Sequence, residues 1–298
     1  MAVTTDVLVI GGGPAGVSAA LYARRSGLDV TILTKGKETG SLAKAHLIEN
    51  YYGFAEPISG AELEARGIAG AKRLGVNVEN AEGMSLLFKD TMDGFRVETG
   101  GETYEAPAVV LAAGAVHQAP PIQGLREREG RGVSYCAICD SFFYRKKTVA
   151  VLGSGAYALH EADILNQPAE KVLILTDGKE PEVDFPEHYA VYTAKVKAVE
   201  GEGKVERVVL ADGTALDIAG LFVALGTAGS SDLARKIGAL LNGTSVQVDE
   251  NMATNVPGLF AAGDCTGGLL QVNKSAYEGA KAGLAASKYV RQQRAKAK

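Results

Sequence analysis

Two cysteines separated by two residues are the first feature of this chain that could do chemistry. Cys136 and Cys139 stand in the stretch CAICD, where Asp140 follows directly. Two thiols at this spacing can close a disulfide and exchange it with a partner through a mixed disulfide. The attacking sulfur must be a thiolate, and an adjacent carboxylate can carry the proton that each half-reaction moves. The stretch therefore predicts a redox-active dithiol assisted by Asp140.

A zinc site is the alternative interpretation of this motif. Such a site needs two more cysteine or histidine ligands. Only Cys265 and four histidines remain, and none of them is paired at ligand spacing, so no metal is expected. Three cysteines in 298 residues also exclude a disulfide scaffold. The expected compartment is the reducing cytosol, where such a motif is catalytic.

Two glycine-rich loops must position this chemistry. The first is GGGPAG at 11–16, between the apolar run 6–10 and helix-forming residues 15–26, and a second apolar segment at 28–33 completes a βαβ unit. In such a unit the glycines let backbone N–H groups and the helix N-terminus approach a pyrophosphate. The loop therefore predicts a dinucleotide site rather than a tight turn alone. An acid usually ends the second strand, but Thr34 and Lys35 stand there instead, so the ribose must be bound differently.

A second loop of the same kind follows the dithiol. GSGAYA at 153–158 lies between a buried-strand pattern at 148–152 and a helix pattern at 156–166, and a further strand pattern runs over 172–175. Two similar βαβ units are an internal repeat of nucleotide-binding domains. Asp177 lies about 20 residues beyond the second loop, where a carboxylate suits a ribose 2′-OH.

The remaining patterns complete an α/β fold with two Rossmann-like dinucleotide-binding domains, each with a small antiparallel β meander. Buried strands are expected at 109–114 and 220–225, and a charged linker loop at 120–131. Helices are expected at 61–74 and 275–290, followed by a frayed basic end. Strand-like segments are expected near 76, 86 and 95–98, and short alternating segments at 191–199, 205–210 and 215–218 suit a small antiparallel meander.

Composition narrows the possible partners. The formal charge of −4 gives no general attraction to nucleic acid. No basic region precedes the first apolar run, which is too short for a signal peptide or a membrane span. The 46% hydrophobic and 22% charged residues are typical of a soluble globular protein. Neither nucleic acid nor membrane is an expected partner.

The order GGGPAG, LAAGA, CAICD, GSGAYA and PGLFAAGD resembles the low-molecular-weight thioredoxin reductase family of flavoproteins over essentially the whole chain. The resemblance implies a homodimer with a discontinuous FAD-binding domain, 1–116 and 243–298, and a second nucleotide-binding-like domain, 117–242, that carries the dithiol. It implies that Cys139 faces the flavin, Cys136 attacks the partner's disulfide, and Asp140 donates and accepts the proton. The implied FAD-site residues are Gly11, Gly13, Pro14, Ala15, Gly16, Thr34, Lys35, Ser41, Leu42, Asn50, Gly114, Gly263, Asp264, Gln271 and Val272.

One departure from the family bears on the electron donor. NADPH-dependent members place a basic stretch after the second Rossmann strand to bind the 2′-phosphate, whereas this chain has acids there, including Asp177 and Glu182. A carboxylate repels a phosphate, so NADPH is not expected. The short segment after Asp177 also leaves little room for the usual helix. The chain thus resembles the branch without pyridine-nucleotide determinants, whose electrons come from ferredoxin or through a second flavin. Yet Gly153 and Gly155 are retained and could hold a second dinucleotide, FAD or NADH.

The favoured function is a FAD-dependent disulfide oxidoreductase that acts on a thioredoxin-like protein disulfide. A ferredoxin-type donor ranks first, NADH second and NADPH last. Two alternatives stay open: a dithiol oxidase that uses oxygen, and a non-catalytic flavin-dithiol redox sensor.

Overall fold

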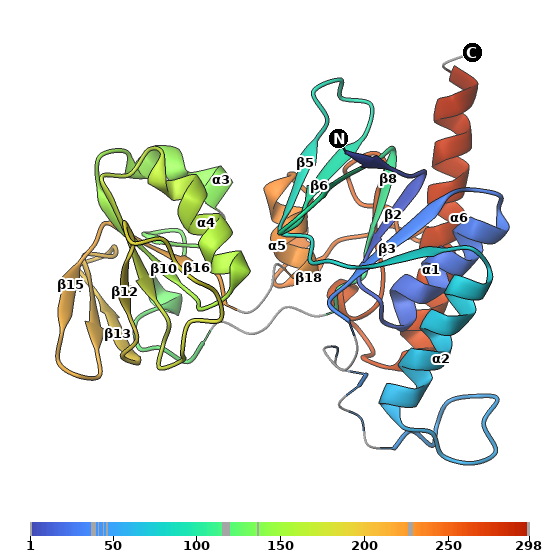
Figure 1. Cartoon of the computed structure of the whole chain (residues 1–298), viewed down its shortest axis with the longest axis horizontal. Helices are drawn as coiled ribbons and strands as arrows, with labels where there is room; N and C mark the ends of the chain where they lie inside the picture. Colours follow the sequence, from blue (N-terminus) through green and yellow to red (C-terminus); the bar gives the residue numbers. More distant parts are fainter. Residues whose placement is uncertain are drawn as a thin grey trace. The chain divides into compact units, whose positions relative to one another are not determined.

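The chain divides into two compact units. The computed structural model describes residues 2–36, 40, 42–43, 45, 47–114, 120–135, 137–225 and 229–296, with the backbone alone at 138 and 139. The first unit combines residues 1–116 with 229–298, and the second comprises 117–228 (Figure 1). The resemblance predicts the second boundary after 242, but helix α5 (Ser230–Lys236) belongs to the first unit. There Lys236 Nζ donates to Met84 O at 3.2 Å.

The core of the first unit is a five-stranded parallel sheet. Its strand order is β19-β8-β2-β3-β4, so the C-terminal part of the chain supplies an edge strand beside β8. Strands β2 and β8 are uniformly apolar and fully buried, as expected for parallel strands covered on both faces. The strands are β2 (Val7–Ile10), β3 (Val30–Thr34), β4 (Asn77–Asn80), β8 (Ala108–Leu111) and β19 (Leu259–Ala261).

Helices α1 (Pro14–Arg25) and α6 (Val272–Lys296) lie side by side on this sheet, and α2 (Gly60–Arg73) also packs on α1 (Figure 1). Two glycines of α6 allow the close approach. A Cβ at Gly279 would stand 2.1 Å from Ala15 O, and one at Gly283 would stand 2.2 Å from Ala19 O. Helix α6 is therefore tied directly to the helix that follows the first glycine loop.

A second sheet of the first unit contains the predicted antiparallel meander. Strands β5 (Ser85–Phe88), β6 (Phe95–Glu98) and β7 (Thr103–Ala106) pair in succession, and β1 (Val3–Thr4) joins β7 in parallel. Burial alternates along β6 and β7, the pattern of a sheet with one face on the core. A short hairpin of β17 (Leu241–Asn242) and β18 (Ser245–Val246) precedes β19.

The second unit repeats the Rossmann-like arrangement. Its parallel sheet has the order β12-β11-β10-β16-β9, and helix α4 (Ala156–Asn166) follows the second glycine loop. The strands are β9 (Val133–Ser134), β10 (Thr148–Leu152), β11 (Lys171–Leu175), β12 (Ala190–Tyr192) and β16 (Gly220–Val223). The meander consists of β13 (Val196–Glu200), β14 (Arg207–Leu210) and β15 (Ala215–Asp217). The predicted α/β class with two such units is confirmed.

Two local predictions are wrong, and the linker contains one anchored residue. Residues 191–199 do not form one meander strand, because β12 pairs in parallel with β11 and only β13 joins the meander. The charged run 126–131 is exposed except at Arg128, which lies in the 3₁₀ turn η1 (Arg126–Arg128) and donates to Gly124 O at 2.9 Å and Gly201 O at 2.7 Å. The basic end is not frayed over 291–296, because α6 continues to Lys296.

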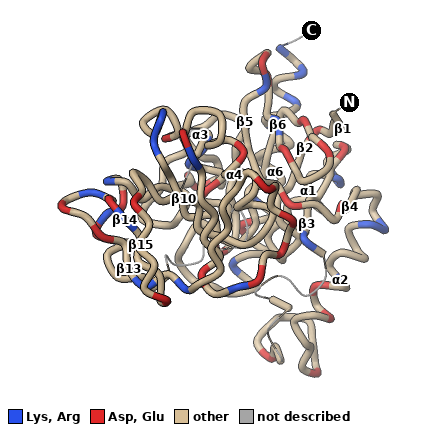
Figure 2. Tube along the Cα trace, turned by 60° about the vertical axis from the view of Figure 1, so that its left-hand side comes forward, with Lys and Arg blue, Asp and Glu red and all other residues tan. Residues whose placement is uncertain are grey.

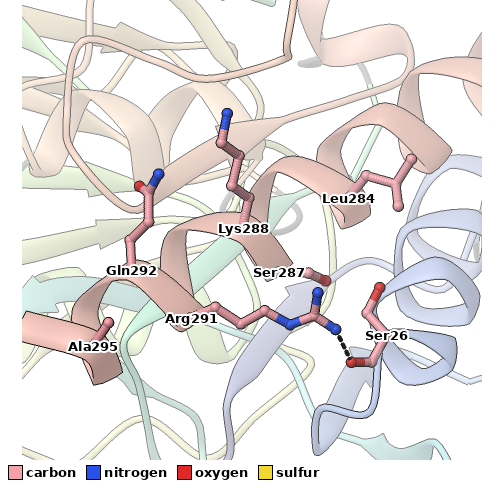
Figure 3. Close-up of a pocket in the computed structure, with 7 residues that line it drawn as sticks. All are labelled: Ser26, Leu284, Ser287, Lys288, Arg291, Gln292 and Ala295. Carbon is pink, nitrogen blue, oxygen red and sulfur yellow. Dashed lines mark hydrogen bonds between the residues drawn. The ribbon is translucent and has the colours of Figure 1, made fainter.

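The C-terminal part of α6 is held by side chains. Arg291 donates to Ser26 O, beside a pocket of about 320 Å³ at the end of α1 (Figure 3). Arg294 donates to Asp6 Oδ1. This pocket lies on the outer part of α6, away from the glycine loop. Among the described helices, α6 included, none is both long and apolar enough to cross a membrane.

Candidate active site

The first glycine loop is packed on one side and open on the other. Gly11 has φ +117°, and a Cβ there would stand 2.2 Å from Ala112 O; one at Gly16 would stand 1.9 Å from Gly11 O. These two glycines are required by the close approach of backbone to backbone. A Cβ at Gly13 would meet no atom within 4 Å. The space in front of Gly13 is therefore free for a ligand.

Helix α1 presents its positive end to this free space. Gly13 is its N-cap, Pro14 occupies the first turn, and that turn has no acidic residue. The unsatisfied N–H groups and the dipole of a helix N-terminus favour an anion. The loop and helix together fit a dinucleotide pyrophosphate, so the geometry of this unit suits FAD.

The turn at Gly263 and Asp264 lies against the same loop. Gly263 has φ +86°, and a Cβ there would stand 2.8 Å from the Ala15 Cβ. Asp264 begins the 3₁₀ turn η3 (Asp264–Thr266), and its Oδ1 accepts from Ser275 Oγ at 3.3 Å. The fold thus brings together two of the predicted cofactor motifs that are about 250 residues apart in the chain.

A partly buried ion pair on α6 supports this turn, and the motifs did not reveal it. Glu278 Oε2 accepts from Gly263 N at 2.9 Å, from Thr266 Oγ1 at 2.8 Å and from Lys274 Nζ at 3.0 Å. Lys274 Nζ also donates to Gly263 O at 2.7 Å. Both charged side chains are 14% exposed. Their i,i+4 spacing just after the Asp264 motif is the signal that could have identified them.

Other predicted residues of the first unit are also placed. Asn50 Nδ2 donates to Gln271 Oε1 at 3.2 Å, which joins two segments from opposite ends of the chain. Val272 is the first residue of α6, Leu42 lies in a turn, and Ser41 lies outside the described residues.

Beyond the end of β3, Lys35 Nζ lies 3.4 Å from Glu82 Oε2. Glu82 follows strand β4, so it brings a carboxylate to the edge where Thr34 replaces the usual acid. Gly114 has φ +78° shortly after β8.

The dithiol turn is held by two carboxylates of the second unit. Helix α3 (Ala137–Asp140) forms the described part of this turn; Cys136 and the Cys139 side chain lie outside the described part of the chain. The buried Ser134 donates to Asp140 Oδ2 at 2.7 Å, and the backbone N of Ala137 donates to Glu161 Oε2 at 2.7 Å. Burial and, secondarily, the charge of Asp140 raise the pKa of Tyr144.

The second glycine loop differs from the first because a carboxylate lies over it. Ser154 Oγ donates to Glu182 Oε1 at 2.8 Å, and Glu182 N donates to Ser154 O at 2.8 Å. A Cβ at Gly155 would stand 3.0 Å from Glu182 Oε2. The place that is open at Gly13 is therefore taken at Gly155 by the chain's own carboxylate. A Cβ at Gly153 would stand 2.2 Å from Ala224 O, so that glycine serves packing.

Asp177 serves the local backbone. It has φ +53°, and its Oδ1 accepts from Val196 N at 2.8 Å, which ties the end of β11 to the start of β13. Residues 176–189 form turns, bends and irregular segments, and no helix, in agreement with the shortness noted in the sequence.

Cys265 is enclosed in the first unit. It is 1% exposed and its Sγ donates to Ala262 O at 3.3 Å. Burial raises the pKa of this thiol to about 11. A buried thiol of this kind is inert, so it is not a third redox cysteine.

Known proteins with related sequences and structures agree with this arrangement. Residues 5–280 match the family model described as pyridine nucleotide-disulphide oxidoreductase. The thioredoxin reductase of Listeria monocytogenes is 33% identical over 309 aligned residues, which cover 96% of this chain and 93% of that protein.

Two solved structures are also similar. The atypical thioredoxin reductase from Desulfovibrio vulgaris Hildenborough has a TM-score of 0.90 at 38% identity, with 96% of this chain and 98% of that chain covered. A ferredoxin-flavin thioredoxin reductase from Clostridium acetobutylicum has a TM-score of 0.75 at 30% identity, with 98% and 100% covered. This chain belongs to the pyridine nucleotide-disulphide oxidoreductase family and is a thioredoxin reductase-like, flavin-dependent disulfide oxidoreductase.

Proposed function

We propose that this protein reduces a thioredoxin-like protein disulfide through the dithiol of Cys136 and Cys139, with electrons from a donor other than NADPH. The family implies FAD, which supplies the electrons that reach the dithiol. The open loop at Gly13 and the adjoining Asp264 turn support placing FAD in the first unit.

Three residues of the second unit have different roles in the disulfide exchange. Cys136 as a thiolate attacks the partner's disulfide, and Cys139 then displaces the partner and closes the internal disulfide. Asp140 holds and returns the proton of this exchange. Its hydrogen bond from Ser134 fixes one carboxylate oxygen in place.

Exposed side chains beside the dithiol support a protein substrate. Phe142 and Phe143, in the 3₁₀ turn η2 (Ser141–Tyr144), are 68% and 67% exposed. A run of three cations follows at 145–147, and Figure 2 shows basic segments near α3. Exposed aromatic side chains with neighbouring cations suit the apolar and acidic surface of a partner protein better than a small dithiol.

One observation carries the donor assignment: Glu182 lies over the second glycine loop. A dinucleotide there would have to displace this carboxylate from Ser154 and would place its pyrophosphate beside a negative charge. Asp177 is also engaged with Val196 N, and the 2′-phosphate of NADPH would bring further negative charge toward it. We infer that the second loop takes neither a second flavin nor a pyridine nucleotide readily. The ranking remains a ferredoxin-type protein first, NADH second and NADPH last, and the similar protein from Clostridium acetobutylicum is a ferredoxin-flavin thioredoxin reductase.

Anaerobic reduction of the purified flavoprotein by NADH, NADPH and reduced ferredoxin in parallel tests the donor. We expect rapid bleaching of the flavin absorbance by ferredoxin and slow bleaching by both nucleotides. Rapid reduction by micromolar NADPH would contradict the ranking. Reduction of an added thioredoxin in the same assay tests the substrate, and Cys136→Ser should abolish that step. An oxidase or a sensor would give no steady thioredoxin turnover.

We also propose a cytosolic homodimer. The presence of only three cysteines, with a working dithiol among them, supports a reducing compartment. The dimer follows from the family alone, and light scattering of the purified protein would test it through a mass of twice 31.0 kDa.

A further inference from the structure

A buried carboxylate lies beside the dithiol turn and has no part in the chemistry described above. Glu161, on α4, is 1% exposed, and its Oε2 is 2.7 Å from the nitrogen of Ala137. Ala137 is itself fully buried and is covalently bonded to Cys136. A side chain 24 residues along the chain therefore contacts the backbone between the two cysteines.

The burial of this carboxylate makes the contact an integral part of the turn. A buried charged group is costly unless hydrogen bonds satisfy it. The N–H groups that open a helix have no partner within that helix, so α3 needs an outside acceptor at its start. Helix α4 packs against α3 and supplies that acceptor from the second glycine loop's own helix. A hydrogen bond to a charged acceptor is stronger than one between neutral groups.

The charge of Glu161 acts differently on the two redox states. The disulfide of Cys136 and Cys139 carries no charge, whereas two-electron reduction with uptake of one proton leaves one thiol and one thiolate. A nearby negative charge disfavours a second one, so it raises the free energy of the thiolate form only. Stabilisation of a reduced form makes a disulfide more oxidising, and destabilisation has the opposite effect.

We propose that Glu161 is a positioning residue of the dithiol, resting on the proposed role of Cys136 and Cys139 as the redox pair. Its hydrogen bond holds the backbone at Ala137, and its charge biases the pair toward the disulfide. This bias gives the reduced enzyme a greater driving force to pass its electrons to a partner disulfide.

Three other titratable residues lie near the dithiol turn, and the variants tested below retain all of them. Asp140 lies on α3 itself, Tyr144 on η2, and His160 precedes Glu161 on α4. Substitutions at Glu161 retain all three of these residues, so E161Q and the wild type differ in sequence at this one carboxylate.

The test compares E161Q with D163N in the full-length holoprotein. E161Q keeps an oxygen acceptor and removes the charge. D163N removes a charge from the same helix, at an exposed residue whose Oδ1 accepts from Tyr189 OH at 2.7 Å. The protein is equilibrated in buffers of known reduced and oxidised glutathione. In this exchange the protein disulfide reacts with two glutathione thiols to give the protein dithiol and oxidised glutathione. Alkylation of the free thiols, read by mass spectrometry, gives the equilibrium constant.

We expect E161Q to shift this constant roughly tenfold toward the dithiol, which corresponds to about 30 mV. The pH profile of Cys136 alkylation should move to lower pH by about one unit, since a tenfold change equals one pKa unit. D163N should do neither. E161D, which keeps the charge on a shorter side chain, should retain the wild-type equilibrium even if E161Q folds poorly.

An equilibrium constant for E161Q within twofold of wild type would overturn the proposal, as would an equal shift in D163N. The exchange equilibrium requires no thioredoxin and no electron donor. Failure of the proposed enzymatic function would therefore appear as absent turnover with the Glu161 shift still present, and the two results can be told apart.

Discussion

At the scale of single residues, the two glycine loops differ at one corresponding position. A side chain at Gly13 would project into open space, whereas one at Gly155 would meet Glu182 at 3.0 Å. The two loops have the same local pattern and begin the same kind of helix. They differ as ligand sites because the carboxylate of Glu182, which comes from a later part of the chain, lies in front of the second loop and no described side chain lies in front of Gly13.

Gly13→Val should release FAD without unfolding the protein. The valine meets no protein atom and the backbone at Gly13 is extended, so the fold accepts it, but the side chain fills the space that a pyrophosphate needs. We expect at least a tenfold fall in bound flavin, measured by the flavin absorbance of the purified protein. Circular dichroism should remain at the wild-type value. Gly70→Val, at another glycine with open space, is the control and should keep its flavin. Full flavin occupancy in Gly13→Val would show that the site lies elsewhere.

The buried thiol of Cys265 should lower the free energy of unfolding at alkaline pH. Burial raises the pKa of its thiol from 9.0 to about 11 in the folded state, so the unfolded state loses this proton first. The stabilisation is complete below pH 9 and is lost as pH rises through 11. The free energy of unfolding of wild type relative to Cys265→Ala should therefore fall by about 2 kcal/mol between pH 8 and pH 10.5.

Urea unfolding of both proteins at a series of pH values measures this difference. The wild-type thiol should also resist alkylation at pH 8 until the protein is unfolded. A constant difference across the pH series would mean that the thiol titrates normally in the folded protein.

At the scale of elements, helix α6 does more than cover the sheet. Its glycines bring it against α1, and its first turns supply Lys274 and Glu278 to the turn at Gly263. The positive φ of Gly263 is a conformation that other residues rarely adopt. The ion pair satisfies both backbone polar groups of this glycine and so fixes the direction of Asp264.

Glu278→Gln should weaken FAD binding about tenfold. Loss of the carboxylate leaves Lys274 without its charged partner at a site that is 14% exposed, and breaking such a pair is costly. If about 1.4 kcal/mol of that cost appears as weaker FAD binding, because the turn is misplaced, the affinity falls tenfold. Titration of the apoprotein with FAD, followed by flavin fluorescence, gives the affinity. Glu62→Gln is the matched control, because Glu62 forms an exposed i,i+4 pair with Arg66 on α2. Equal affinities in both variants would mean that the pair has no role at the turn.

At the scale of the whole molecule, the two units differ in how the chain builds them. The first unit needs both ends of the chain, since β19 and α6 complete a sheet and helix layer begun by β2 and α1. The second is continuous and has its own apolar core around Leu152, Leu175 and Leu221. The dithiol turn, Glu161 and the covered glycine loop all belong to this continuous unit.

The fragment 117–228 should therefore fold alone. It contains a complete five-stranded sheet, its meander and its core, which is enough for an independent domain of 112 residues. We expect a colourless protein with a cooperative unfolding transition and a dithiol that alkylates after reduction. A yellow fragment with stoichiometric FAD would contradict the open and covered states assigned to the two loops. A fragment 1–116 alone should not fold, because β8 would lose β19 and α1 would lose α6.

Local sequence patterns were sufficient for most of the architecture. Runs such as Val7–Ile10 and Thr148–Leu152 are apolar and β-branched because both faces of a parallel strand are buried, and this need appears in the residues themselves. The glycine loops, the dithiol and the family were also identifiable, because each is carried by residues that lie close together in the sequence. Prediction failed where the partner of a segment decides the outcome: residues 190–192 and 196–200 are neighbours in the sequence, yet they join different sheets.

The sequence by itself determined the α/β class, the repeated glycine loops, the dithiol with its carboxylate, and membership of a flavin-dependent disulfide oxidoreductase family. Only the tertiary structure decided which loop is open, which carboxylate contacts the dithiol turn, and what supports the Asp264 turn. Glu182, Glu161, Lys274 and Glu278 carry these decisions. Nothing in their own neighbourhood in the sequence distinguishes Glu182 or Glu161 from a surface acid. Hydrogen bonds and charges act through space over a few ångströms, so their partners are set by how the chain folds and not by its order.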